Sequence, residues 1–275
     1  MRLLVLGAAG MLGSDVVLTP GDHDVVGLSR RDADVLDVAA LEHAVEAHHP
    51  DAVVNCAAYT DVDGAEADED GAMAVNAVGA LNVAEAAAEI GATVVYPSTD
   101  YVFDGGKREP YLESDPVSPR SAYGRSKLEG EVATATVPRH LIVRTAWLFG
   151  THGRNFVETM LGAAERGSLK VVDDQVGCPT YTRHLAAAIV RMVGAETTGI
   201  VHTVGSGQCS WYEFARTIFA RANTEVDLAP CTTAEFPRPA PRPAYSVLRS
   251  QRQDVPVLPP WQQGLDEYLA ERVAA

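Results

Sequence analysis

Residues 3–13 of the chain are Leu3-Leu4-Val5-Leu6-Gly7-Ala8-Ala9-Gly10-Met11-Leu12-Gly13. The apolar run predicts a buried strand, and the glycines after it predict a tight turn that opens a helix over residues 11–18. In such a turn, Gly7 allows the sharp bend, Gly10 lets a pyrophosphate approach the backbone, and Gly13 lets the helix pack closely on the strand. The unpaired N–H groups at the helix start attract an anion. The stretch therefore indicates a dinucleotide site, with the spacing G-x-x-G-x-x-G in place of G-x-G-x-x-G.

Four further strands and three helices are predicted in the first half of the chain. The apolar runs fall at residues 24–28, 52–55, 93–98 and 141–144, and the helical patterns at residues 41–49, 74–90 and 123–132. Strands that alternate with helices form right-handed βαβ units, which build a parallel sheet with helices on both faces. We therefore predict an α/β protein with a Rossmann-type doubly wound parallel sheet.

The second half is less regular and predicts a smaller C-terminal α/β substrate-binding domain. Helical patterns fall at residues 156–166, 183–193 and 211–222, and short strands at 169–172 and 200–203. Residues 230–243 are rich in proline, which excludes a helix or central strand and favours extended backbone. We predict a dinucleotide-binding domain over residues 1–148, completed by part of 183–205, and a substrate-binding region over 149–275.

The composition restricts the partners. Of 275 residues, 37 are Asp or Glu and 22 are Lys or Arg, which gives a net charge of −15. Such a field disfavours nucleic acid and membrane surfaces. The four cysteines lie far apart without C-x-x-C spacing, so neither a zinc site nor a disulfide framework is predicted, and no metal is predicted. No stretch is typical of a signal peptide or a membrane span, which favours a cytoplasmic location.

The end of the second predicted strand bears on the choice of coenzyme. An acidic residue there would bind a ribose 2′-hydroxyl and select NAD. The chain instead has Ser29 and Arg30, followed by Arg31, which suit a 2′-phosphate, so NADPH is favoured over NADH. Asp37 is a candidate for the adenine side of this pocket. The alternative is that Arg30 and Arg31 are solvated charges on a loop.

Tyr123 and Lys127 stand four residues apart on a predicted helix and so share one face. A free tyrosine has a pKa near 10, which a nearby ammonium lowers. Tyr123 could then act as a general acid in carbonyl reduction. Thr99 lies where the fourth strand ends, at the sheet edge where open α/β sheets bind ligands, so its hydroxyl could bond the reacting carbonyl. These three residues are the predicted catalytic group.

On these motifs the chain is similar to the extended short-chain dehydrogenases/reductases, and within them it resembles the dTDP-4-dehydrorhamnose reductase family. The similarity runs nearly from end to end. It rests on NCAAYTDVD (55–63), STDYVFDG (98–105), RTAWLF (144–149), DDQVGCPT (173–180) and RPAYSVL (242–248).

The resemblance implies a role for each matching residue. Substrate contacts are implied for Thr99, Asp100 and Trp147, and Arg242 is a candidate for the substrate diphosphate. Trp147 is equally explained as a core aromatic residue, and Arg242 as part of an extended linker. The implied coenzyme contacts are Gly10, Met11 and Leu12 at the diphosphate, Ser29, Asp37 and Val38 at the adenosine, Ala57, Ala58 and Tyr59 at the ribose and nicotinamide, and Tyr123 and Lys127 at the reacting end.

The implied reaction is NADPH-dependent reduction of the C4 keto group of dTDP-4-dehydro-β-L-rhamnose, with Tyr123 as the proton donor. The partner is thus a nucleotide sugar, and the resemblance leaves a homodimer open. An epimerase of the same superfamily is the first alternative. A non-catalytic subunit similar to the regulatory subunit of methionine adenosyltransferase is the second. A dehydratase is disfavoured because Tyr101, and not a glutamate, follows Asp100.

Overall fold

The computed structural model describes residues 1–274, whose centre is one parallel sheet of six strands. Their order across the sheet is β10–β5–β4–β3–β1–β2. All five pairings are parallel. This is the doubly wound Rossmann-type sheet that the alternating pattern predicts. The strands are β1 (Arg2–Leu6), β2 (Asp24–Leu28), β3 (Ala52–Asn55), β4 (Thr93–Thr99), β5 (His140–Thr145) and β10 (Gly199–His202).

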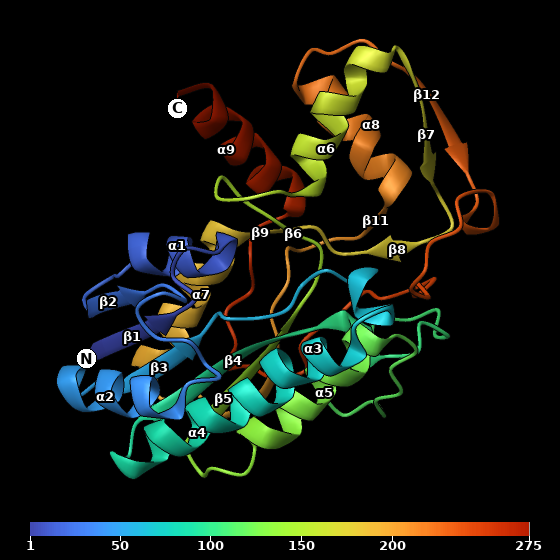
Figure 1. Cartoon of the computed structure of the whole chain (residues 1–275). Coiled ribbons are helices and arrows are strands. Elements are labelled where there is room, and N and C mark those ends of the chain that lie inside the picture. Colours follow the sequence, from blue (N-terminus) through green and yellow to red (C-terminus); the bar gives the residue numbers. More distant parts are fainter. Residues whose placement is uncertain (275) are drawn as a thin grey trace.

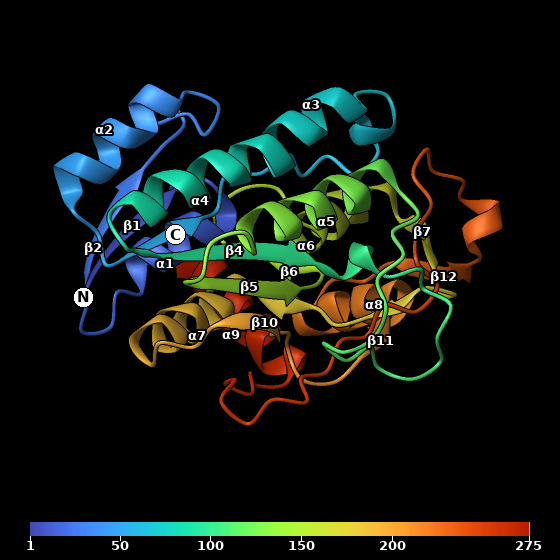
Figure 2. The same cartoon turned by 90° about the horizontal axis from the view of Figure 1, so that it is seen from below.

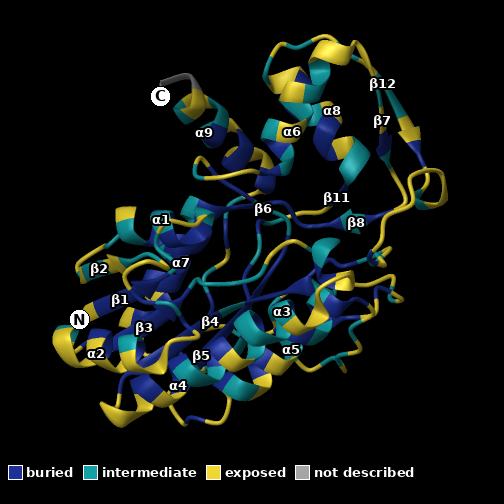
Figure 3. Ribbon diagram, viewed as in Figure 1, coloured by how far each residue is buried: buried dark blue, intermediate teal, exposed yellow. Residues whose placement is uncertain are grey.

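Helices cover both faces of the sheet (Figure 2). One face carries α1 (Met11–Leu18) and α7 (Thr182–Gly194), and the other carries α2 (Val38–His48), α4 (Gly79–Glu89) and α5 (Ala122–Thr134). Because helices cover both faces of β1, its residues 3–6 are buried without alternation. Figure 3 shows the strands as the buried centre and the outer faces of the helices as exposed.

The strand order reverses at β1, which creates the place where this kind of sheet binds ligands. The chain runs from β1 to β2 on one side and then returns to β3 on the other side of β1. Leu6 of β1 is in register with Asn55 of β3, the last residue of each strand. The loops that follow these two strands therefore leave the sheet together, at the topological switch point.

The remaining elements lie beyond the carboxyl ends of the strands (Figure 1). Aromatic side chains of Phe149, Tyr181, Phe214, Trp261 and Tyr268 form the core of this part. Its helices are α6 (Phe156–Ala163), α8 (Trp211–Arg221) and α9 (Trp261–Ala274), and its short strands are β6 (Leu148–Phe149), β7 (Ser168–Val172), β8 (Val176–Gly177), β9 (Thr180–Tyr181), β11 (Cys209–Ser210) and β12 (Asp227–Cys231).

Three sequence expectations need correction. The helix expected over residues 74–90 begins earlier, as α3 (Glu69–Met73), and passes through a π-helical turn (Ala74–Val78) before α4. Residues 230–243 are not extended throughout, because Thr232 and Glu235 form a capping box around a 3₁₀ turn (Thr233–Glu235). Helices α3 and α9 and strand β12 were not anticipated. The division of the chain near residue 148 stays a prediction.

Candidate active site

The glycine loop joins β1 to α1 at the switch point. Gly7 has a φ of 70°, and a Cβ there would lie 2.6 Å from the backbone N of Ala57. At Gly13 a Cβ would lie 2.4 Å from the carbonyl oxygen of Gly7. Both positions therefore require glycine, as the predicted turn does. The turn places Gly7 against the loop after β3.

Helix α1 has an open N-terminus that fits a pyrophosphate. Gly10 occupies the N-cap, is exposed, and has no side-chain cap within the described residues. The backbone N–H groups of Met11, Leu12 and Gly13 therefore have no partners inside the helix and can bind an anion. The side chain of Leu12 lies in the core, so it can meet a ligand only through its backbone.

The residues predicted for the adenosine lie beside this loop, on the surface. Ala8 N donates to Leu28 O (3.0 Å), which brings the end of β2 next to the glycine loop. Ser29 and Arg30 are engaged with acidic neighbours, Ser29 Oγ with Asp32 (2.6 Å) and Arg30 Nε with Asp34 (2.9 Å). Farther along, Asp37 caps α2 by accepting from Ala40 N (3.1 Å), and the adjacent Val38 is half exposed.

The loop after β3 is held by a residue that the sequence did not single out. Asn76, in the π-helical turn, is buried. Its Oδ1 accepts from Tyr59 N (2.9 Å), and its Nδ2 donates to Tyr59 O (3.0 Å) and to Ser126 Oγ (2.9 Å). Asn76 thus ties the segment of Ala57, Ala58 and Tyr59 to helix α5. Its one signal in the sequence is an amide within an apolar helical pattern.

Helix α5 carries Tyr123 in its first turn. The helix begins at Ala122 because Ser121 caps it: Gly124 N donates to Ser121 Oγ (3.0 Å). Ala122 N donates to Glu66 Oε1 (2.8 Å), which also fixes this end. The fold brings Tyr123 beside the hydroxyl of Thr99, the last residue of β4.

The pKa values of Tyr123 and Lys127 differ from the expectation. Burial raises the pKa of Tyr123, and the Thr99 hydroxyl opposes this only in part. The buried Lys127 Nζ donates to Pro97 O (2.7 Å) and lies 3.9 Å from the centre of the Tyr96 ring. Burial lowers the pKa of Lys127 itself to about 7, against the attraction of Glu131. Lys127 is not among the groups that shift the Tyr123 pKa, so the expected lowering is not found, and the loss of water around the phenol dominates.

A buried ion pair fastens α5 to the sheet below these residues. Arg144 of β5 donates to both carboxylate oxygens of Glu131, from Nε (2.8 Å) and from Nη2 (2.6 Å). Ser98 Oγ of β4 donates to the same carboxylate (2.5 Å). Glu131 lies one turn beyond Lys127 on α5. The ion pair thereby fixes the position of α5, and with it of Tyr123 and Lys127, relative to the ends of the strands.

Two residues predicted to contact substrate lie at the ends of β4 and β5. Asp100 accepts from Thr99 Oγ1 (3.0 Å), and burial raises the pKa of its carboxyl to about 6, opposed by the hydroxyls of Ser246 and Thr99. Trp147 follows β5 with a φ of 49° and stacks on Trp211 of α8, with ring centres 3.5 Å apart and planes at 5°. The indole of Trp147 is therefore held by a partner from the second half of the chain.

Arg242 reaches the site from the proline-rich segment. Its Nη1 donates to Tyr101 Oη (3.1 Å), and its Nη2 pairs with Asp63 (2.9 Å). The Tyr101 ring meets the Tyr123 ring edge to face, with centres 5.6 Å apart. Asp63 and Tyr101 were not predicted as site residues, although both lie within motifs that carry the family resemblance.

Neither a candidate metal cluster nor a candidate membrane span occurs among residues 1–274. No group of three or more His, Cys, Asp or Glu side chains there is arranged to hold a metal ion. No helix in that part of the chain is long and apolar enough to cross a membrane.

Comparison with known proteins gives the family. The family model described as "RmlD substrate binding domain" matches residues 1–273. The chain belongs to this family. A relative from Mycobacterium tuberculosis, named dTDP-4-dehydrorhamnose reductase, is 41% identical, over 98% of this chain and 92% of the relative. A relative from Streptomyces antibioticus, named probable dTDP-4,6-dihydroxy-2-methyloxan-3-one 4-ketoreductase, is 43% identical, over 100% of this chain and 97% of the relative.

A solved structure matches nearly the whole chain. It is the dTDP-4-dehydrorhamnose reductase of Bacillus anthracis in complex with NADP, with a TM-score of 0.95 and 37% identity. The match covers 98% of this chain and 99% of that one. The predicted resemblance to the dTDP-4-dehydrorhamnose reductase family and the predicted Rossmann-type fold are thereby confirmed.

Proposed function

We propose that the chain is an NADPH-dependent oxidoreductase that reduces the C4 keto group of dTDP-4-dehydro-β-L-rhamnose to dTDP-L-rhamnose. The observation that carries the proposal is the position of the Tyr123 phenol beside Thr99, at the strand ends that also bear the glycine loop. The relatives named for this reaction support the substrate. The solved relative in complex with NADP supports the coenzyme.

The chemistry follows from the protonation of these side chains. NADPH, when bound, would supply a hydride to the carbonyl carbon of the substrate. Tyr123 donates its proton to the carbonyl oxygen as that oxygen becomes an alkoxide, and the raised pKa of Tyr123 keeps this proton in place at neutral pH. The Thr99 hydroxyl donates a second hydrogen bond to the same oxygen. Lys127, in its charged form, stabilises the phenolate that remains.

The other site residues bind and orient. The backbone at Gly10, Met11 and Leu12 holds the coenzyme diphosphate, and Arg242 meets the diphosphate of the nucleotide sugar. Asp100 and Trp147 border the sugar. The adenosine end lies along Ser29, Arg30, Asp37 and Val38, and the ribose and nicotinamide lie along Ala57, Ala58 and Tyr59. A cytoplasmic location and a homodimer stay predictions.

The test is NADPH oxidation with dTDP-4-dehydrorhamnose made in situ. Tyr123→Phe is expected to lower kcat about 100- to 10,000-fold while NADPH binding persists, because only the proton donor is lost. Tyr212→Phe on α8 is the matched control, expected at wild-type rate. Near-normal turnover by Tyr123→Phe would contradict the mechanism, and no turnover by the folded wild type would contradict the substrate.

The coenzyme preference has its own variant. Arg30 is largely exposed and is free to exchange Asp34 for a phosphate. We expect Arg30→Ala to raise the KM for NADPH about 5- to 10-fold, the value of one charged hydrogen bond near the surface, and to leave the KM for NADH unchanged. An equal rise in the KM for both coenzymes would show that Arg30 does not bind the 2′-phosphate.

A second candidate is reduction of the 4-keto group of another dTDP-deoxysugar. The Streptomyces antibioticus relative supports it, because it is named as a 4-ketoreductase for a different sugar at similar identity. A substrate panel of dTDP-4-keto sugars separates the two candidates by kcat/KM. The same assay separates the remaining alternatives: an epimerase would interconvert sugars without net NADPH oxidation, and a non-catalytic subunit would do neither.

A further inference from the structure

Asp63 makes contacts that none of the roles above explains. It lies in the loop after β3, and its partners lie 175 to 179 residues later in the chain. Its Oδ2 pairs with Arg238 Nη2 (2.6 Å) and with Arg242 Nη2 (2.9 Å), and its Oδ1 accepts from Ala240 N (3.2 Å). Only 17% of the Asp63 side chain is exposed. One carboxylate therefore gathers three residues of a distant segment.

These contacts matter because that segment has little else to hold it. Residues 236–243, here called the proline segment, contain four prolines, which have no N–H to donate. Residues 237–243 belong to no helix or strand. Throughout the described residues, the hydrogen bonds and ion pairs of residues 237–243 go to Asp63 or to Tyr101 alone.

The proline segment brings a guanidinium to the reacting end of the site. Arg242 lies between Asp63 and the Tyr101 hydroxyl, and the Tyr101 ring contacts the ring of Tyr123. Its side chain is 15% exposed, so it is already ordered and largely dehydrated. An arginine held in place loses less rotamer entropy when it binds a phosphate.

The local charge favours an anion. Two guanidinium groups share one carboxylate, so Asp63, Arg238 and Arg242 together carry one net positive charge, in a chain of net charge −15. Guanidinium groups fit phosphate oxygens with paired hydrogen bonds. The ligand class that matches is the diphosphate of a nucleotide sugar, which the proposed function already requires.

We infer that Asp63 is a positioning residue for substrate binding: it clasps the proline segment to the loop after β3 and so holds Arg242 where the substrate diphosphate binds. The inference rests on the proposed function for the identity of the ligand. Asp63 acts through Arg242 and touches no reacting atom.

The test measures dTDP binding by titration calorimetry, which needs no turnover. Asp63→Asn removes a negative charge from an anion site, so charge alone would tighten binding. The positioning role of Asp63 predicts the opposite, a rise in the Kd for dTDP of about tenfold. Asp61→Asn is the matched control, because it makes the same charge change in the same loop on a side chain that only caps Gly64. It is expected to change the Kd less than twofold.

A double variant separates positioning from an independent effect. In the Arg242→Ala background, Asp63→Asn is expected to change the Kd less than twofold further, because the residue that it positions is gone. The KM for the nucleotide sugar should rise in Asp63→Asn, with kcat and the KM for NADPH within threefold of wild type. Should Asp63→Asn not fold, Arg242→Lys tests the same contact, since one ammonium cannot reach both Asp63 and Tyr101.

Several outcomes would contradict the inference that Asp63 positions Arg242. The first is an unchanged or tighter Kd for dTDP in Asp63→Asn, or in Arg242→Lys where that variant replaces it. The second is an equal rise in Kd when Asp63→Asn is made in the Arg242→Ala background. The third is no dTDP binding by the wild type. Failure of the proposed function looks different. In that case the wild type would bind dTDP, and the variants would behave as expected, but no dTDP-4-keto sugar would be reduced.

Discussion

Lys127 is one of three lysines among 22 cationic residues, and the fold buries it completely. Arginine would fit this place poorly, because its broad planar head stays charged in almost any environment. A lysine can lose its proton, and burial lowers its pKa to about 7. The residue is therefore poised to change charge near neutral pH, although its contacts are with Pro97 and Tyr96 before any ligand is bound.

This pKa predicts a pH dependence. If charged Lys127 supports the reaction, kcat/KM for NADPH falls as pH rises above about 7, by roughly tenfold per pH unit. Tyr123 adds no decline below pH ~9, because its raised pKa keeps it protonated. Lys127→Arg should be slower but independent of pH between ~6 and ~9, since a guanidinium does not titrate there.

Initial-rate kinetics across this pH range check the prediction. The unbound enzyme titrates in kcat/KM, so the profile for NADPH reports Lys127 before the coenzyme binds. A wild-type profile that stays flat to pH ~9 would contradict it. So would a Lys127→Arg variant that declines in parallel with the wild type.

At the scale of elements, helix α5 is located by its buried ion pair. Side chains of Arg144 and Glu131 are 3% and 4% exposed, so each needs the other to offset its desolvation. Arg125 and Glu69 join the same helix to α3 on the surface, where both are more than 40% exposed. The first pair sets the register of α5 on the sheet, and the second is screened by water.

Removal of one charge should separate these two pairs. Glu131→Gln leaves the Arg144 guanidinium buried without a counter-charge, which is expected to lower the free energy of unfolding by about 3–5 kcal/mol. Glu69→Gln is the matched control, with a much smaller expected loss, because water screens this exposed pair. Urea denaturation monitored by circular dichroism measures both. Similar losses in the two variants would contradict a special role for the buried pair.

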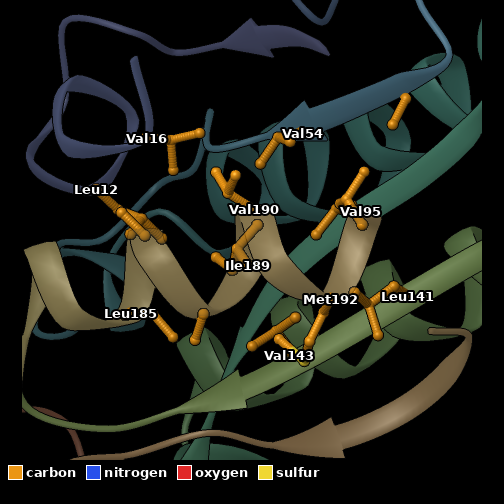
Figure 4. Packing of buried hydrophobic residues seen from close by; sticks show 14 of the residues in the cluster. Leu12, Val16, Val54, Val95, Leu141, Val143, Leu185, Ile189, Val190 and Met192 are labelled. Atoms are coloured by element: carbon orange, nitrogen blue, oxygen red, sulfur yellow. The ribbon is translucent and has the colours of Figure 1, made fainter. Parts of the chain in front are cut away.

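At the scale of the whole molecule, the sheet is completed from the second half of the chain. Helix α7 and strand β10 come after the short strands β6 to β9, yet α7 packs on α1 and β10 pairs with β5. Figure 4 shows Leu185, Ile189 and Met192 of α7 against Val143 and Leu141 of β5. Without these residues, the part of this face that α7 covers and the edge at β5 would be open to water.

A cavity at this junction should destabilise the entire fold. Ile189 is fully buried, so Ile189→Ala is expected to lower the free energy of unfolding by about 2–5 kcal/mol. Leu18→Ala in α1 is the control, because Leu18 is 59% exposed and a surface truncation costs about 0.5 kcal/mol or less. We expect the far-UV and near-UV circular dichroism signals of Ile189→Ala to be lost in a single shared unfolding transition. Loss of the near-UV signal alone would contradict this coupling.

Much of the architecture was predictable because local patterns determine it. Each strand of the sheet was anticipated to within a residue at either end, since strands buried on both faces appear as uninterrupted apolar runs. The π-helical turn was not anticipated; its Asn76 makes hydrogen bonds to two other segments, which no local pattern reveals. Helix α9 packs in an aromatic cluster whose other members lie at least 40 residues before it in the chain.

The sequence by itself determined the α/β class, the glycine turn, and the spacing that places Tyr123 and Lys127 on one helical face. These features depend on backbone sterics and on residues within one or two turns of each other. The tertiary structure alone decided which charges meet: Asp63 with Arg238 and Arg242, and Glu131 with Arg144. It also decided that burial dominates the pKa of both Tyr123 and Lys127. The physical reason is that pairing and desolvation depend on distances between segments far apart in the chain, which no local pattern encodes.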